Sequence, residues 1–134
     1  MSADEPRYFT PEEAEALLPE IDGLLGTAQE LLTRLEQVQQ RQEREAHTNG
    51  QVLGRGVATP GAEDEPRTIQ NQLHAIIGEF QARGVILRDI RTGLIDFPAR
   101  RAGEEIFLCW QRGEPMRIEW WHPTDTGIAG RQRL

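Results

Sequence analysis

A long apolar stripe of helical period constrains the fold of this chain more than any other feature. Its members recur at steps of three and four residues, which places them on one face of a helix: Ala14, Leu17, Leu18, Ile21, Leu24, Leu25, Ala28, Leu31, Leu32, Leu35 and Val38. Thr10, Pro11 and Glu13 form the pattern of a helix N-terminus with a capping box. We therefore predict a helix over residues 10–46, kinked near Pro19, whose ring removes a backbone hydrogen bond.

A second, shorter stripe predicts a partner helix over residues 66–84, between Pro66 and Gly84. The intervening residues 47–65 are rich in glycine and polar residues, which is typical of a flexible loop. The two helices therefore form an antiparallel hairpin. The first stripe would span about 36 Å and the second only about 17 Å, at about 1.5 Å per residue. We expect the uncovered apolar surface to face both a sheet and a second copy of the chain.

From Val85 onward the apolar period changes to two, and we predict strands at Val85–Ile90, Leu94–Phe97, Glu105–Trp110 and Met116–Trp121. The short links between these strands favour antiparallel pairing. The prediction is an α+β fold in a single domain over residues 1–134. Its N-terminal helical hairpin packs on a C-terminal antiparallel meander of three or four strands over residues 85–121, followed by an irregular tail over 122–134.

The composition excludes several classes of function. A net charge of -7 and a pI near 5.0 disfavour binding to nucleic acid, and no apolar stretch approaches the roughly 20 residues of a membrane span. The chain contains no lysine and no serine beyond Ser2, so it lacks a Walker-type phosphate loop, a Schiff-base lysine and an internal serine nucleophile. A lone cysteine and an acidic N-terminus without the features of a signal peptide indicate a reducing, cytoplasmic setting.

Four segments, in order and spacing, resemble an uncharacterised prokaryotic family, the Domain of Unknown Function 2203. They are Tyr8-Phe9-Thr10-Pro11-Glu12-Glu13-Ala14 with Leu17-Leu18-Pro19, the segment from Asp89 to Pro98, Leu108-Cys109-Trp110, and Gly113-Glu114 through Trp121-His122 to Gly127, Gly130 and Arg131. The resemblance implies no known activity. Its motifs, dense in Trp, Asp, Glu and His, imply a common site on the sheet. Ile128 departs from the aromatic residue expected there, so the resemblance implies no stacking role at that position.

His122 is the titratable residue of greatest interest, because a histidine with two or three carboxylates can hold zinc, manganese or iron. Its candidate partners are Glu104 and Glu105 across the ladder, Asp96 on a neighbouring strand, and Asp125 three residues later. The alternative is a histidine that is hydrogen-bonded to a carboxylate at a strand end.

A tight hairpin through Gly113 would place Cys109 opposite Arg117 and Glu104 opposite His122. Cys109 would then lie about 17 Å or more from His122, at about 3.3 Å per residue along the strand. We therefore predict that Cys109 is a buried apolar residue and not a ligand.

Three further groups of residues are candidate sites, and each of them has an alternative interpretation. Asp89 and Asp96 flank the turn at Gly93 and could share a proton or a metal, although an ion pair between Arg88 and Asp96 is the simpler interpretation. Strand alternation predicts that Trp120 points inward and Trp121 outward, either as a binding anchor or packed under the tail. The remaining candidate is an anion-binding patch formed by Arg100, Arg101, Arg131 and Arg133. The alternative is that these four side chains are simply solvated.

Two functions follow. The first is a cytoplasmic interaction or regulatory domain that self-associates through the hairpin and has a pocket lined by Trp121, His122 and Arg131. The second is a small divalent-metal-binding protein or metal-dependent enzyme with its site around His122. We favour the first, because nucleophiles and general bases are scarce and only a metal would supply strong chemistry.

Overall fold

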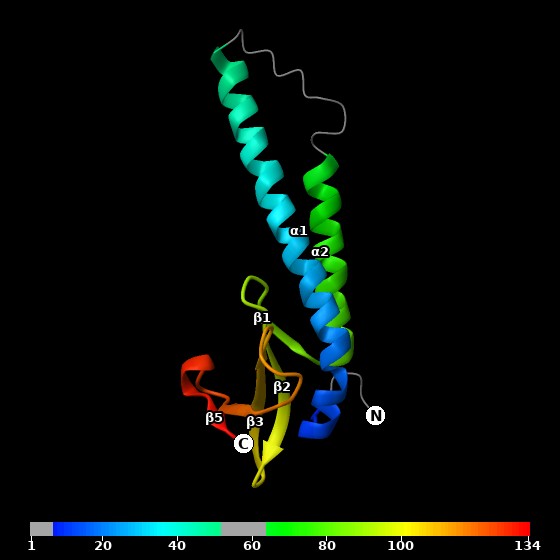
Figure 1. The fold of residues 1–134 in the computed structure, drawn as a ribbon, viewed down its shortest axis with the longest axis vertical. Helices are drawn as coiled ribbons and strands as arrows, with labels where there is room; N and C mark the ends of the chain where they lie inside the picture. Colours follow the sequence, from blue (N-terminus) through cyan, green and yellow to red (C-terminus); the bar gives the residue numbers. More distant parts are fainter. Residues whose placement is uncertain (1–6, 52–63) are drawn as a thin grey trace.

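A computed structural model describes residues 7–51 and 64–134. Two helices, α1 (Pro11–Gln51) and α2 (Asp64–Arg83), form an antiparallel hairpin that projects from a small sheet (Figure 1). The predicted loop begins later and ends earlier than expected, since residues 47–51 continue α1 and residues 64 and 65 open α2. Residues 52–63, the centre of that predicted loop, lie outside the described residues. No helix in the described ranges is both long and apolar enough to cross a membrane.

The helix ends have the capping interactions that the sequence predicts. The Thr10 backbone N–H donates to Glu13 Oε1 at 3.0 Å, and the Glu13 N–H donates to Thr10 Oγ1 at 3.1 Å. Pro19 lies inside α1 without ending it. At the C-terminus of α2, which lies at the same end of the hairpin as the start of α1, Gly84 adopts a φ of 74° and the Val85 N–H donates to the Phe80 carbonyl at 3.0 Å (Figure 1). This Schellman-type end turns the chain out of α2 and directly into the first strand.

The sheet has five antiparallel strands in the order β1-β2-β3-β4-β5, which confirms the α+β fold class and adds one strand to the expected three or four. The strands are β1 (Ile86–Asp89), β2 (Leu94–Arg101), β3 (Glu104–Gln111), β4 (Trp120–Pro123) and β5 (Gln132–Arg133). The extra strand comes from the tail, which also forms the short 3-10 helix η1 (Ile128–Gly130). Backbone pairing with β4 therefore orders a segment that its composition predicted to be irregular.

The register between β3 and β4 differs from the prediction. Trp120 pairs with Cys109 and His122 pairs with Phe107, so the predicted pairing of Cys109 with Arg117 is wrong. The chain makes a wide loop over residues 112–119 instead of a tight hairpin at Gly113. The Trp110 indole N–H stabilises this loop by donating a hydrogen bond to the Pro115 carbonyl at 2.9 Å. Because the register shifts by three residues, an odd number, each β4 side chain lies on the opposite face from the predicted one.

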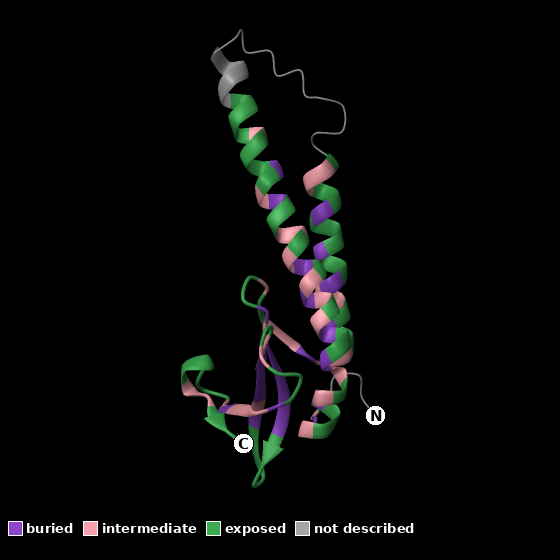
Figure 2. Cartoon of the chain, in the orientation of Figure 1, coloured by how far each residue is buried: buried purple, intermediate pink, exposed green. Residues whose placement is uncertain are grey.

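One face of the sheet packs against the lower half of the hairpin and forms the core (Figure 2). Phe97 and Trp110 are the largest fully buried side chains on this face, and Leu18 and Leu25 of α1 belong to the same buried cluster. Farther along the hairpin, the apolar stripe of α1 contacts α2 instead of the sheet. The sheet therefore covers the part of α1 for which α2 is too short. The opposite face of β2, β3 and β4 carries a different set of side chains.

Candidate functional site

Three polar side chains gather on the sheet face that the hairpin does not cover. Asp96 on β2 pairs directly with Cys109 on β3, and His122 on β4 pairs with Phe107, two residues from Cys109 on the same face. One candidate ligand atom from each of the three residues lies within 4.8 Å of the other two. Asp96 and His122 are each 2% exposed and Cys109 is 1% exposed. The sheet register thus creates a buried Asp-Cys-His cluster from residues far apart in the chain.

Asp96 is the shared hydrogen-bond acceptor of this cluster. Its Oδ2 accepts from Arg88 Nε at 2.8 Å, which confirms the predicted ion pair, and its Oδ1 lies 3.0 Å from His122 Nε2. The other ring nitrogen, His122 Nδ1, lies 2.8 Å from the Pro123 carbonyl. A carbonyl oxygen can only accept, so Nδ1 carries a proton and Nε2 is the atom that faces the carboxylate.

Cys109 is buried, as predicted, but it belongs to the cluster. Burial raises the pKa of its thiol to about 12, and the neighbouring Asp96 carboxylate adds to this shift by charge and by a hydrogen bond, while Arg131 opposes it. At neutral pH the thiol is therefore protonated. A neutral, enclosed thiol is a poor nucleophile, so the arrangement does not favour cysteine-based covalent catalysis.

Side chains from the segments around β4, together with Arg88 of β1 and Phe107 of β3, cover the cluster. Arg131 donates from its Nη2 to both carboxylate oxygens of Glu114, at 2.8 and 2.7 Å, and its guanidinium lies 4.8 Å from the centre of the Trp120 ring. Phe107 packs against His122 with 5.5 Å between ring centres, and Arg88 lies over the Phe107 ring. These contacts explain why three polar groups on an outer sheet face are shielded from water.

The structure brings together some predicted site residues and not others. Asp96 and His122 meet as expected, but Glu104 and Glu105 pair with Arg101 and Arg100, are exposed, and lie outside the cluster. Asp125 is exposed and is also not part of the cluster. Asp89 is not part of the Asp-Cys-His cluster: its carboxylate accepts from the Arg91 N–H and the Thr92 hydroxyl, and so stabilises the β1–β2 turn.

The two adjacent tryptophans have exchanged the places predicted for them. Trp121 packs against the core on the hairpin side, whereas Trp120 shares the face of Cys109. Trp121 therefore cannot line one pocket with His122 and Arg131, as the predicted register required. The four arginines also divide among different partners and do not form one patch: Arg131 and Arg133 stack on Trp120, Arg100 stacks on Tyr8, and Arg101 stacks on Trp121.

Cys109 was missed as a site residue, and the signal for it in the sequence is weak, since only Gly103 of the turn is a residue that favours a positive φ. Ala102 and Gly103 have φ angles of 52° and 81°, so they form a two-residue turn of type I′. A two-residue turn at this position pairs Arg101 with Glu104 and, by counting outward, Asp96 with Cys109. A hairpin assigned at Ala102-Gly103 would have placed the thiol beside the carboxylate.

The raised pKa of the Cys109 thiol predicts a loss of stability at alkaline pH. The pKa of about 12 lies above the ordinary value of 9.0, so the stabilisation is complete below pH 9 and is lost as the pH rises toward 12. We expect the free energy of unfolding to fall by about 2–3 kcal/mol between about pH 9 and pH 11. Urea unfolding across this pH range measures the fall in stability. Few other groups titrate in this range, because the chain has no lysine and one tyrosine.

Cys109→Ala should remove this fall in the free energy of unfolding at alkaline pH, and Tyr8→Phe should leave it in place. If the free energy of unfolding fell equally with pH in Cys109→Ala and in the unmodified protein, the Cys109 thiol would not be its cause.

Comparison with known proteins gives one match. The model of the family described as "Uncharacterized conserved protein (DUF2203)" matches residues 7–134. No curated protein and no solved structure is significantly similar to the chain. The matched range includes every residue of the Asp-Cys-His cluster and every strand of the sheet.

Proposed function

We propose a metal-binding function for this protein, which belongs to the family of uncharacterised conserved proteins described as DUF2203. The observation that carries the proposal is the cluster of Asp96, Cys109 and His122, whose candidate ligand atoms lie within 4.8 Å of one another on three adjacent strands. Carboxylate, thiolate and imidazole are all ligands that Zn²⁺ accepts, and the Cys109 thiol would release its proton to solvent on binding the ion.

The distances in the cluster suit a tetrahedral ion. Zinc–nitrogen and zinc–oxygen bonds of about 2.0–2.2 Å separate two ligand atoms by about 3.4 Å, and a thiolate at about 2.3 Å lies slightly farther from its neighbours. Asp96 Oδ1 and His122 Nε2 are 3.0 Å apart, so they need to separate by only a few tenths of an ångström. A small rotation of the two side chains supplies this change.

The hydrogen bonds around the cluster also have the pattern of a metal site. The Pro123 carbonyl fixes the proton of His122 on Nδ1, so that in the neutral ring Nε2 offers a lone pair to an ion beside Asp96. Arg88 holds Asp96 through Oδ2 and leaves Oδ1 for the ion. Outer partners of this kind orient ligands and tune metal affinity.

Of the metals considered from the sequence alone, the ligand set favours zinc over manganese, while iron also accepts thiolate and imidazole ligands. A thiolate and an imidazole suit zinc, whereas manganese prefers oxygen ligands. Each of the three residues is at most 2% exposed, so the bound ion would be enclosed. We infer a structural or regulatory ion that ties β2, β3 and β4 together, in preference to an ion that activates water for hydrolysis.

Calorimetric titration of Zn²⁺ into the full chain, purified without an affinity tag, tests the proposal. We expect one ion per chain, together with a rise in thermal stability through linkage of binding to folding. Cys109→Ser keeps the shape of the side chain but replaces the sulfur ligand by a hydroxyl, and should lower the affinity by about tenfold or more. His122→Ala should do the same.

The matched control is His74→Ala, because His74 lies exposed on α2, away from the sheet cluster. It should bind Zn²⁺ with unchanged affinity. Absence of stoichiometric Zn²⁺ binding, or binding that persists equally in Cys109→Ser, would exclude the proposed site.

Self-association through the helical hairpin, the function favoured from the sequence, is a separate prediction that rests on the length of the apolar stripe. In the described part of the chain, the most exposed large hydrophobic side chains are Met116, Ile128 and Leu134, and none of them lies on the hairpin. The metal site therefore has the stronger structural support. Light scattering tests self-association directly, and a monomeric particle at tens of micromolar would exclude it.

A further inference from the structure

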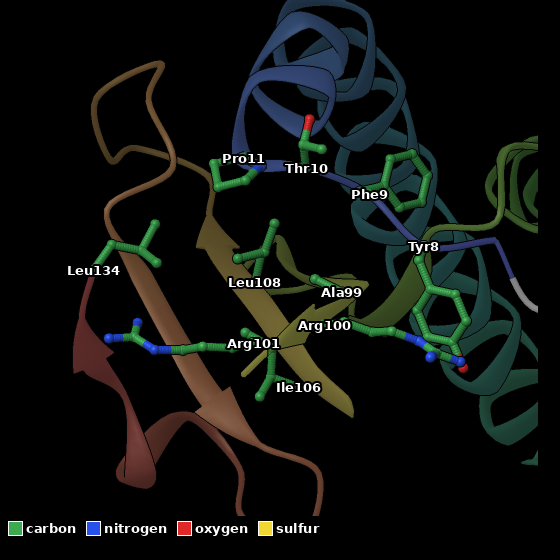
Figure 3. A pocket seen from close by; sticks show the side chains of 10 residues that line it. All are labelled: Tyr8, Phe9, Thr10, Pro11, Ala99, Arg100, Arg101, Ile106, Leu108 and Leu134. Atoms are coloured by element: carbon green, nitrogen blue, oxygen red, sulfur yellow. The ribbon is translucent and has the colours of Figure 1, made fainter. Parts of the chain in front are cut away.

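The core face of the sheet has an open end where α1 begins. A cavity of about 370 Å³ lies there, between the N-terminus of α1, the ends of β2 and β3, and Leu134 (Figure 3). Its inner wall is apolar, since Phe9, Ala99, Ile106 and Leu108 line it and all four side chains are buried. This volume falls within the range of about 300–1,000 Å³ that is typical of small-molecule sites.

The cavity is separate from the Asp-Cys-His cluster. Ile106 and Leu108 face the cavity, whereas Phe107 and Cys109 alternate with them and face the other side of β3. The sheet therefore stands between the two sites, and a ligand in the cavity would not touch the metal ligands.

The rim of the cavity carries positive charge. Arg100 and Arg101 both line the cavity, and Figure 3 shows Arg100 extending toward Tyr8 while Arg101 extends to the side of Leu134. Each guanidinium lies over an aromatic ring, Arg100 at 4.4 Å from the centre of Tyr8 and Arg101 at 4.7 Å from that of Trp121. Within the described residues, neither forms an ion pair with a carboxylate, although Glu104 and Glu105 are their cross-strand neighbours.

The N-terminus of α1 does not supply the anion contact. The capping box already uses the backbone N–H groups of Thr10 and Glu13, and Glu12 and Glu13 place negative charge in the first turn. The stacked arginines are therefore the groups available to an anion. A guanidinium that stacks on a ring keeps its N–H edge free for a carboxylate, which it can bind with two hydrogen bonds.

We propose that this cavity binds a small carboxylic acid with an aliphatic body, with the chain against Ile106 and Leu108 and the carboxylate on Arg101. The exposure of Leu134, 47%, fits this assignment, because the side chain stands at the mouth and would be covered by the ligand. The chain has a net charge of -7, so attraction of an anion has to come from a local pair of arginines and not from the whole molecule.

Calorimetric titration of the full chain with decanoate below its micelle concentration tests the proposal. We expect saturable binding of one decanoate per chain, and decanol, which has the same chain without the charge, should bind at least about tenfold more weakly. Arg101→Gln should weaken decanoate binding by about tenfold or more and leave decanol binding unchanged. Leu134→Asp, a change at an exposed position, should weaken both.

The matched control is Arg133→Gln, which removes an arginine that stacks on Trp120, pairs with Glu119 and is not among the residues lining the cavity. It should bind decanoate like the unmodified protein. No saturable binding up to millimolar decanoate, equal binding of decanol and decanoate, or unchanged decanoate binding in Arg101→Gln would each overturn the proposal. These outcomes are independent of Zn²⁺ binding.

Discussion

Leu25→Asp is expected to prevent the chain from folding, or to lower its free energy of unfolding by about 4 kcal/mol or more. Leu25 is fully buried, with 0% exposure, in the core that α1 forms with the sheet. The substitution removes a large apolar side chain and brings an ionised carboxylate into a region with no partner for it. Far-ultraviolet circular dichroism during urea unfolding measures the effect.

Thr33→Asp is the matched control, because it adds the same charge to an exposed position two turns farther along α1. We expect its stability to change by less than about 0.5 kcal/mol. If Leu25→Asp unfolded at the same urea concentration as Thr33→Asp, the packing of the hairpin on the sheet would be incorrect.

Asp96→Ala is expected to cost about 3 kcal/mol in the metal-free protein. Asp96 accepts hydrogen bonds from Arg88 and from the Cys109 thiol, and its side chain is 3% exposed. Removal of a shared buried acceptor leaves its donors without a partner, which costs more than a surface ion pair contributes. Chemical unfolding in the presence of a chelator gives this value without any contribution from bound metal.

Asp89→Ala provides the comparison for Asp96→Ala. Asp89 is exposed and stabilises only the β1–β2 turn, through the Arg91 N–H and the Thr92 hydroxyl. Its loss should cost about 1 kcal/mol. Equal effects of the two substitutions would show that the buried network around Asp96 contributes nothing beyond a turn contact.

The hairpin and the presence of the sheet were predictable because local signals fix them. The capping box at Thr10 and Glu13, the period of the apolar stripe and the glycine at the end of α2 each act within a few residues. The ion pair between Arg88 and Asp96 was predictable for the same reason, since both residues flank one short turn.

The site was less predictable because it depends on strand register. The register of β4 is set by a wide loop whose anchor, the hydrogen bond from Trp110 to the Pro115 carbonyl, joins a side chain to the backbone and leaves no periodic signal. The predicted register of β4 was wrong by three residues, so the prediction placed His122 far from Cys109 and put Trp120 and Trp121 on the wrong faces of the sheet. By contrast, the pairing of Asp96 with Cys109 follows from a two-residue turn and could have been found.

Absorption spectroscopy of the protein titrated with Co²⁺ tests the central claim most directly, because cobalt(II) occupies zinc sites and reports its ligands. We predict one Co²⁺ per chain, with a thiolate-to-cobalt charge-transfer band in the near ultraviolet and the strong visible bands of a tetrahedral ion. Addition of Zn²⁺ should remove both, and Cys109→Ser should lack the charge-transfer band. A spectrum indistinguishable from that of hexaaquacobalt(II) would contradict the claim that Asp96, Cys109 and His122 hold a metal.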